Sequence, residues 1–280
     1  MQRACSHPQT WVVKRFPRFR QIFSLPTPVL LWDGLFTKEL WDSLSQIRAP
    51  YGWQRLPHQA IASTLLLLNG SESAQRFAAS EKPRRSCIRC AVVGNGGMLN
   101  GSRWGWLIDA HDYVFRVNGA VIKGFEADVV TKTSFYGFTV NTMKHSIVND
   151  RNLGFTSVPQ RRGLRYVFIP ASIRAYVMLR SAILGVPVPK GRVLKSSLMN
   201  TEAKYIYMPS TGALLLLTAL HTCDQVSAYG FITKKYWKFS DHYFEQEKKP
   251  LKFYTNHDLQ LEAALWKDLH EAGIIQLYQH

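Results

Sequence analysis

The chain is poor in acidic residues and in cysteine. Its 280 residues include 35 Lys and Arg against 19 Asp and Glu, which gives a formal net charge of +16, and four cysteines. No apolar run approaches the roughly 20 residues of a membrane-spanning helix, and no signal peptide opens the chain. With 46% hydrophobic residues the chain has enough apolar side chains for a sizeable core, which argues against global disorder. The basic excess indicates either a solvated basic surface or an anionic partner.

Several motifs of nucleotide and metal chemistry are missing. There is no G-x-x-x-x-G-K-[ST] loop, and the glycine turn Gly94 to Gly97 has Leu99 where the dinucleotide fingerprint needs its third Gly. Asp-x-Asp, with which many nucleotide-sugar enzymes hold a metal under a diphosphate, does not occur. The basic residues are dispersed and match no RNA-binding signature, so binding of nucleic acid is a hypothesis from composition alone.

The cysteine spacing allows three interpretations. Cys87 and Cys90 have the spacing of a redox dithiol or of half a zinc site. A zinc site needs a second close pair, whereas Cys5 and Cys223 lie far apart in the sequence. The even count also suits two disulfides, which require an oxidising compartment. Of two N-x-S sequons, Asn69 is the better candidate for glycosylation, since it lies between an expected helix and a polar linker.

Strands and helices alternate along most of the chain. Strands are expected at 88–94, 112–118, 132–138, 164–170, 225–231 and 274–278, and helices at 38–47, 57–70, 172–185, 209–223 and 256–273. Asn256 is a candidate N-cap of the last helix, in which Leu261, Leu265 and Leu269 have helical spacing. The alternation predicts an α/β fold with a mainly parallel sheet. Residues 1–86 are expected to form an N-terminal arm with short helices, and residues 87–280 the catalytic domain.

Two groups of polar residues are candidates for ligand binding or catalysis. Ser210, Thr211 and Gly212 open an apolar helix, either as a simple cap or as an anion site at the positive helix end. His242 and His257 each lie beside carboxylates in the sequence. An imidazole suits proton transfer near neutral pH, so both histidines are candidates for acid–base work.

Four stretches, in this order, resemble the sialylmotifs of the animal sialyltransferases, glycosyltransferase family 29. "CIRCAVVGNGGMLNGSRWGWLIDAHDYVFRVNGAVIKGFEADVVTKTSF" resembles the large motif, and "YMPSTGALLLLTALHTCDQVSAYGF" the small one. "HYFE" is similar to the third motif, and His257 followed by Glu262 to the very-small motif. The resemblance covers about residues 5 to 280. Within the family the sequence is most similar to the α-N-acetylgalactosaminide α-2,6-sialyltransferases.

The resemblance implies an inverting transferase with a Rossmann-like sheet, a variant of the GT-A glycosyltransferase fold. The donor would be CMP-sialic acid, and the acceptor the 6-hydroxyl of GalNAc O-linked to Ser or Thr of glycoproteins, with no metal or other cofactor and no nucleic acid. His257 would be the general base, with Asp258 and Glu262 as candidates to orient it, and His242 would stabilise the leaving phosphate. The implied donor-binding residues are Asn95, Asn118, Ser210, Thr211 and Gly212.

The resemblance also bears on the cysteines and on location. It implies a disulfide between Cys90 and Cys223, and we infer a second one between the remaining Cys5 and Cys87. Each would close a long loop. Family members are type II membrane proteins of the Golgi that face its lumen. This chain has no signal-anchor, so we expect membrane attachment only through an anchor absent from it.

The sequence departs from the family pattern in two places. Val130 stands where relatives usually have Gly, and a φ above 0° there would strain a valine. The segment from Pro187 to Tyr207 is short, where the family leads us to expect another strand and helix near the acceptor. The alternative to an active enzyme is therefore a catalytically impaired variant that binds the nucleotide.

Overall fold

The computed structural model describes residues 5, 9–25, 27–68, 87–189, 208–253 and 257–279. The chain divides into two compact units. The first is made of Met1–Pro28, Ser80–Val167 and Pro209–His280, and the second of Val29–Ala79 and Phe168–Met208. Each unit thus combines stretches that are distant in the sequence. The division into an arm, 1–86, and a catalytic domain, 87–280, remains a prediction.

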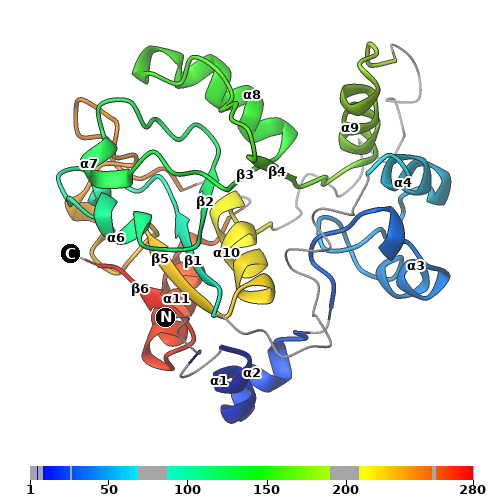
Figure 1. Cartoon of the computed structure of the whole chain (residues 1–280), viewed down its shortest axis with the longest axis horizontal. Coiled ribbons are helices and arrows are strands. Elements are labelled where there is room, and N and C mark those ends of the chain that lie inside the picture. The colour runs from blue at the N-terminus through cyan, green and yellow to red at the C-terminus, as the bar shows by residue number, and fades with distance from the viewer. Residues whose placement is uncertain are drawn as a thin grey trace. The chain divides into compact units, whose positions relative to one another are not determined.

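Six strands form one sheet in the order β4-β3-β2-β1-β5-β6 (Figure 1). They are β1 (Arg89–Val93), β2 (Tyr113–Val117), β3 (Phe135–Phe138), β4 (Arg165–Phe168), β5 (Gln225–Tyr229) and β6 (Gln276–Leu277). β1 pairs in parallel with β2 and β5, β2 with β3, and β5 with β6. The predicted α/β fold with a mainly parallel sheet is confirmed, and each of the six strands lies within its expected range.

The longer helices match the expected ranges. They are α3 (Lys38–Leu44), α4 (His58–Leu65), α9 (Ile173–Leu184), α10 (Thr211–Thr222) and α11 (Leu259–Glu271). The sequence analysis did not predict α8 (Val140–Asn149), although Thr139 and Thr142 form a capping box at its start. Shorter elements are α1 (Gln9–Arg15), α2 (Pro17–Ile22), η1 (Asp33–Leu35), η2 (Gly97–Leu99), α6 (Gly105–Asp109), α7 (Glu126–Val129), η3 (Arg151–Leu153) and η7 (Tyr236–Lys238).

Helix α11 differs from its prediction at the start and on its buried face. Asp258 is the N-cap, with its side chain accepting from the Leu261 N–H at 2.9 Å, whereas Asn256 lies outside the described residues. Leu261 is exposed. The buried residues of α11 are Glu262, Trp266 and Leu269. The helix therefore turns a carboxylate inward, which the leucine spacing did not predict.

The strand order fixes where a ligand would bind. From β1 the chain builds β2, β3 and β4 on one side, and then returns through α10 to add β5 and β6 on the other. In such sheets ligands bind outside the carboxyl ends of the strands, at the point where the order reverses. That point lies here between β1 and β5.

Helix α10 packs on the sheet against β1, β2, β3 and β5 (Figure 1). Cys223, the residue after the helix, is bonded to Cys90 in the first half of β1, with 6.1 Å between their Cα atoms. The C-terminus of α10 is thus held at the amino edge of the sheet. Its 12 residues span about 18 Å, roughly the length of a strand, so its N-terminus reaches the carboxyl edge.

All four cysteines are paired, as Cys5–Cys87 and Cys90–Cys223. These are the pairs that the resemblance and the remaining count led us to expect. The C-x-x-C spacing therefore marks neither a redox dithiol nor half a zinc site, because each sulfur is bonded to a distant partner. None of the helices in the described ranges has the length and apolar character needed to cross a bilayer.

The second unit has a small aromatic core of its own. The rings of Trp41 and Trp53 stack with 5.5 Å between centroids. The Trp53 indole N–H donates to the Tyr176 hydroxyl at 2.9 Å, which ties the loop before α4 to α9. Ile61 and Leu65 of α4 are buried in the same cluster.

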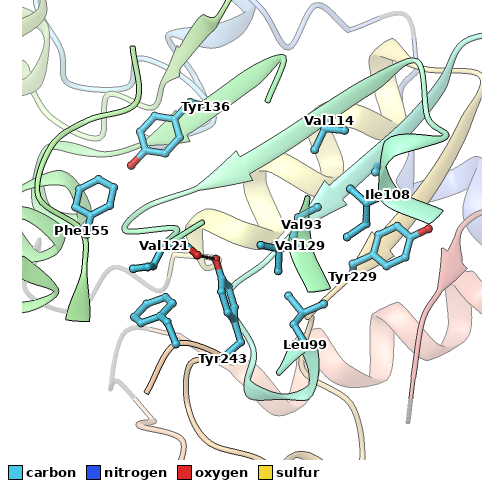
Figure 2. Close-up of a cluster of buried hydrophobic side chains, with 12 residues drawn as sticks. Val93, Leu99, Ile108, Val114, Val121, Val129, Tyr136, Phe155, Tyr229 and Tyr243 are labelled. Atoms are coloured by element: carbon cyan, nitrogen blue, oxygen red, sulfur yellow. Dashed lines mark hydrogen bonds between the residues drawn. The ribbon is translucent and has the colours of Figure 1, made fainter. Parts of the chain in front are cut away.

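In the first unit, the main hydrophobic core includes residues of the loops that follow β1 and β2. Tyr243 is fully buried there, and its hydroxyl donates to the carbonyl of Val121 (Figure 2). Leu99 and Val129 belong to the same cluster. This packing positions the carboxyl edge of the sheet, where the candidate site lies.

Val130 has a positive φ, the condition under which the sequence analysis expects strain at this position. Its φ is 55° and its ψ 168°, a region that is essentially restricted to glycine. The buried guanidinium of Arg116 donates to the Val130 carbonyl at 2.6 Å and also to the Val129 carbonyl. These hydrogen bonds hold the backbone at Val130 in this conformation, which costs about 1–3 kcal/mol of free energy.

Val130→Gly is expected to stabilise the protein. The substitution removes the strain, while the greater freedom of glycine in the unfolded chain offsets about 0.5–1 kcal/mol of the gain. We expect Tm to rise by about 2–4 °C per kcal/mol gained. Differential scanning calorimetry of Val130→Gly beside Val130→Ala tests this, because alanine removes the two methyl groups but keeps the Cβ. Equal loss of Tm in both variants would show that side-chain packing outweighs the strain.

Candidate active site

The glycine turn after β1 serves the packing of the backbone. A Cβ at Gly94 or Gly96 would lie 2.6 or 2.7 Å from the Gly230 carbonyl oxygen, and one at Gly97 would lie 2.2 Å from the Ser240 carbonyl oxygen. The N–H groups of Gly96 and Gly97 donate to those same carbonyls, at 3.0 and 3.2 Å. These groups are therefore used within the protein. The structure thus supports a structural role for this turn over that of a phosphate-binding loop.

Two asparagine side chains at the ends of β1 and β2 have unused acceptors. The Asn95 amide nitrogen donates to the Val117 carbonyl at 3.3 Å. Asn118 has a φ of 50°, which asparagine tolerates better than most residues. The Oδ1 atoms of Asn95 and Asn118 are buried, and neither has a hydrogen-bond partner among the described residues. Buried polar atoms are rarely left unpaired, so both are candidates to accept from a ligand.

Ser210 joins the start of α10 to α11. Its hydroxyl oxygen accepts from the Ala213 N–H at 3.0 Å and so caps α10. Its own N–H and hydroxyl donate to the two carboxylate oxygens of Glu262, at 2.7 and 2.8 Å. The hydroxyl proton is therefore committed to Glu262. Within this arrangement Ser210 has no proton left for a bound phosphate, which sequence reasoning did not anticipate.

The first backbone N–H groups of α10 are the donors at this helix start that could bind an anion. The N–H groups at the start of a helix have no intrahelical acceptor and carry the positive end of the helix dipole. A Cβ at Gly212 would meet Phe231 at 3.5 Å, which is an ordinary contact. Packing within the described residues thus does not explain a glycine here, whereas close approach of a ligand to the Thr211–Gly212 backbone would.

His242 is held between two carboxylates. Its Nδ1 lies 3.8 Å from Asp241 Oδ2 and 3.5 Å from Glu245 Oε1, and its backbone N–H donates to Glu245 Oε2 at 3.0 Å. The imidazole stacks on Phe244 with 5.1 Å between centroids. The carboxylates on the Nδ1 side fix the ring and leave Nε2 for another partner.

The pKa values of the carboxyl groups around His242 are shifted in different directions. Burial raises the pKa of Asp241, and the charge of His242 lowers it in part. Burial also acts to raise the pKa of Glu245, but hydrogen bonds from Ser240 and His242 outweigh it and lower the pKa. Burial raises the pKa of Asp150, which His242 again lowers by its charge. Asp150 thus lies within electrostatic reach of His242, and sequence reasoning did not single it out, because the two residues lie far apart in the chain.

His257 directly precedes Asp258, the N-cap of α11. Burial raises the pKa of the Glu262 carboxyl, while the hydrogen bonds from Ser210 and the charge of His257 lower it, so the imidazole lies within electrostatic reach of Glu262. The sequence suggested Asp258 and Glu262 as residues that orient His257. The structure shows a further contact for each: Asp258 caps α11 and Glu262 holds Ser210. That they orient His257 stays a prediction.

The third motif is tied to the turn after β1. The Tyr243 N–H donates to the Asn95 carbonyl at 3.0 Å, and the Asn100 side-chain amide donates to the Tyr243 carbonyl at 2.8 Å. His242 is thereby held beside the turn that carries Asn95. Asn100 belongs to the second sequon, and this bond occupies its amide nitrogen. Asn69, the expected glycosylation site, lies outside the described residues.

Comparison with known proteins agrees with this geometry. The sequence profile of glycosyltransferase family 29 (sialyltransferase) matches residues 30–200 and 190–274. The chain is 64% identical to human alpha-N-acetylgalactosaminide alpha-2,6-sialyltransferase 2, over 99% of this chain and 83% of that protein. It is 41% identical to chicken alpha-N-acetylgalactosaminide alpha-2,6-sialyltransferase 1, over 93% of this chain and 52% of that protein.

A solved structure shares the fold. A crystal structure of a mammalian sialyltransferase, 22% identical in sequence, superposes with a TM-score of 0.62 over 99% of both chains. The two parts of the profile match overlap at residues 190–200, within the segment that the sequence analysis found short. The fold, the profile and the relatives agree, and the chain belongs to glycosyltransferase family 29, the sialyltransferases.

Proposed function

We propose that the protein transfers sialic acid from CMP-sialic acid to the 6-hydroxyl of GalNAc linked to Ser or Thr of glycoproteins. The 64% identity to a human enzyme named for this reaction supports the choice of linkage and acceptor. The observation that carries the proposal is the placement of the Asn95 and Asn118 amides and the start of α10 at the carboxyl edge of the sheet, close to the point where the strand order reverses.

The donor site is assigned to that edge. Asn95 and Asn118 each offer a buried acceptor to the hydroxyl or amino groups of the CMP moiety. The N–H groups of Thr211 and Gly212 face its phosphate at the positive end of α10. Ser210 acts through its cap of α10, since its hydroxyl proton is held by Glu262. Because these groups suit a single phosphate, the proposal needs no metal.

The chemical step is an in-line displacement at the anomeric carbon of sialic acid. His257 removes the proton of the acceptor 6-hydroxyl as its oxygen attacks, and the configuration inverts. The bond to the CMP phosphate oxygen breaks, and negative charge develops there. His242, held by Asp241 and Glu245, neutralises this charge together with the start of α10.

The disulfides favour a lumenal location. Cys5–Cys87 and Cys90–Cys223 close long loops and are stable in an oxidising compartment. The Golgi lumen is the compartment that the family resemblance implies. We therefore assign the protein to the Golgi lumen.

The catalytically impaired variant is the weaker alternative. It rests on the short segment from Pro187 to Tyr207, of which 190–207 lies outside the described residues. High identity to relatives named as transferases supports an active enzyme.

The test uses the full chain secreted behind a signal peptide, with CMP-sialic acid as donor and a GalNAc-Thr glycopeptide as acceptor. We expect one sialic acid added at carbon 6 of GalNAc, read by mass spectrometry and NMR, and an unchanged rate in the presence of EDTA. Binding of CMP by calorimetry without transfer to any GalNAc acceptor would favour the impaired variant. Loss of activity in EDTA would contradict the metal-free site.

A further inference from the structure

Three aromatic rings, two of them exposed, form a cluster on the loop between β5 and α11. The Tyr236 ring meets those of Trp237 and Phe253 edge to face, with 5.6 and 5.5 Å between centroids. Trp237 is 58% exposed and Phe253 48% exposed. We call Tyr236, Trp237 and Phe253 the aromatic surface. Tyr236 is half-buried and joins the other two rings, which face solvent.

The aromatic surface lies next to the candidate site along the chain. The loop leaves the carboxyl end of β5, the edge that carries the donor site. The short helix η7, which holds Tyr236 and Trp237, ends four residues before His242, and Phe253 precedes His257 by four residues. The contact of Tyr236 with Phe253 thus joins the two stretches of chain that lead to the two histidines.

The loop is also basic. Residues 230–253 contain six lysines against three carboxylates, two of which, Asp241 and Glu245, are held at His242. In the described part of the chain, no carboxylate lies within ion-pair distance of Lys234, Lys235 or Lys238, which flank the rings and are exposed. Clustered cations of this kind attract an anionic partner.

We infer that the aromatic surface binds the polypeptide that carries the acceptor GalNAc. O-glycosylated segments are rich in Ser, Thr and Pro, and proline-rich chains adopt the extended polyproline II helix. Such helices dock on exposed aromatic faces, as in known recognition domains. The lysines add a preference for carboxylate side chains in the same peptide. The inference rests on the proposed function and adds the peptide as a second determinant of the acceptor.

The experiment compares three acceptors for wild type and Trp237→Ala. They are GalNAc on a small aglycone, GalNAc-Thr in a proline-rich peptide with two glutamates, and the same peptide with glutamines. For the acidic peptide we expect Trp237→Ala to raise KM by about 5- to 20-fold at unchanged kcat, as for an exposed aromatic contact. For the small acceptor its KM should equal that of wild type. Wild type should prefer the acidic peptide over the glutamine peptide, and added salt should reduce this preference.

Trp11→Ala is the matched control. Trp11 is 50% exposed on α1, which begins beside Asp224 at the amino end of β5, on the opposite edge of the sheet. It should leave all three acceptors unchanged. Thermal melts establish that both variants are folded, and Trp237→Phe should restore most of the affinity for peptide.

Two outcomes would overturn the inference. One is an equal effect of Trp237→Ala on the small and the peptide acceptors, and the other is no preference of wild type for the peptide acceptors over the small one. Transfer to the small acceptor with no effect of peptide would overturn this inference alone. Failure of wild type to use any GalNAc acceptor would instead overturn the proposed function.

Discussion

His257→Ala is expected to lower kcat for sialyl transfer by about 10²- to 10⁴-fold, the usual contribution of a general base. In the proposed mechanism the His257 imidazole accepts the proton of the attacking hydroxyl, and alanine cannot. His257 is not assigned to the nucleotide, so binding of CMP should change little. Initial rates at saturating donor and acceptor, with calorimetric titration of CMP, measure both quantities.

His242→Ala provides the contrast. His242 is assigned to the phosphate, so its loss should weaken CMP binding as well as lower kcat. The two variants together separate the base from the residue that stabilises the leaving group. Wild-type turnover in His257→Ala, or loss of CMP binding in that variant alone, would show that the roles are assigned wrongly.

Glu262→Ala is expected to raise the Kd for CMP by about 10-fold and to lower kcat/KM for the donor by about 10- to 100-fold. The variant loses two hydrogen bonds to a carboxylate, each worth about 1.5–3 kcal/mol, and leaves the Ser210 N–H unpaired. The start of α10 then loses its fixed position against the donor. Because Glu262 is buried, Tm should also fall, so kinetics are measured well below the transition.

Two further variants test whether Glu262 acts through Ser210. If it does, the double variant Ser210→Ala/Glu262→Ala should lose less affinity for CMP than the sum of the losses in the two single variants. Glu271→Ala is the control, because Glu271 lies on the same helix but pairs at the surface with Lys267 at 3.4 Å. Additive losses in the double variant would mean that Glu262 acts independently of Ser210.

The strands were predictable because each is short, apolar and bounded by polar or turn residues. β1 and β2 are buried over most of their length, and this leaves a clear signal in the sequence. Helix α8 was not predicted, since Thr142 completes its capping box where the usual pattern has Glu or Gln. The inward face of α11 was missed because leucines are a stronger signal than a buried carboxylate such as Glu262.

The candidate site, too, was predictable from the sequence only in part. The motifs singled out His242, His257 and the asparagines as candidates by type and order alone. They did not indicate that the Ser210 proton is bound to Glu262, or that the glycines after β1 pack on backbone, because both facts depend on segments distant in the sequence.

By itself the sequence determined the α/β class, the family and the residue types of the site, since these depend on local periodicity and on motifs read along the chain. The tertiary structure decided which of those residues meet. It brought Glu262 to Ser210 across 52 positions and Tyr243 to Val121 across 122. It also placed Val130 in a backbone region suited to glycine. Such contacts arise from packing between distant elements, for which the local sequence carries no periodic signal.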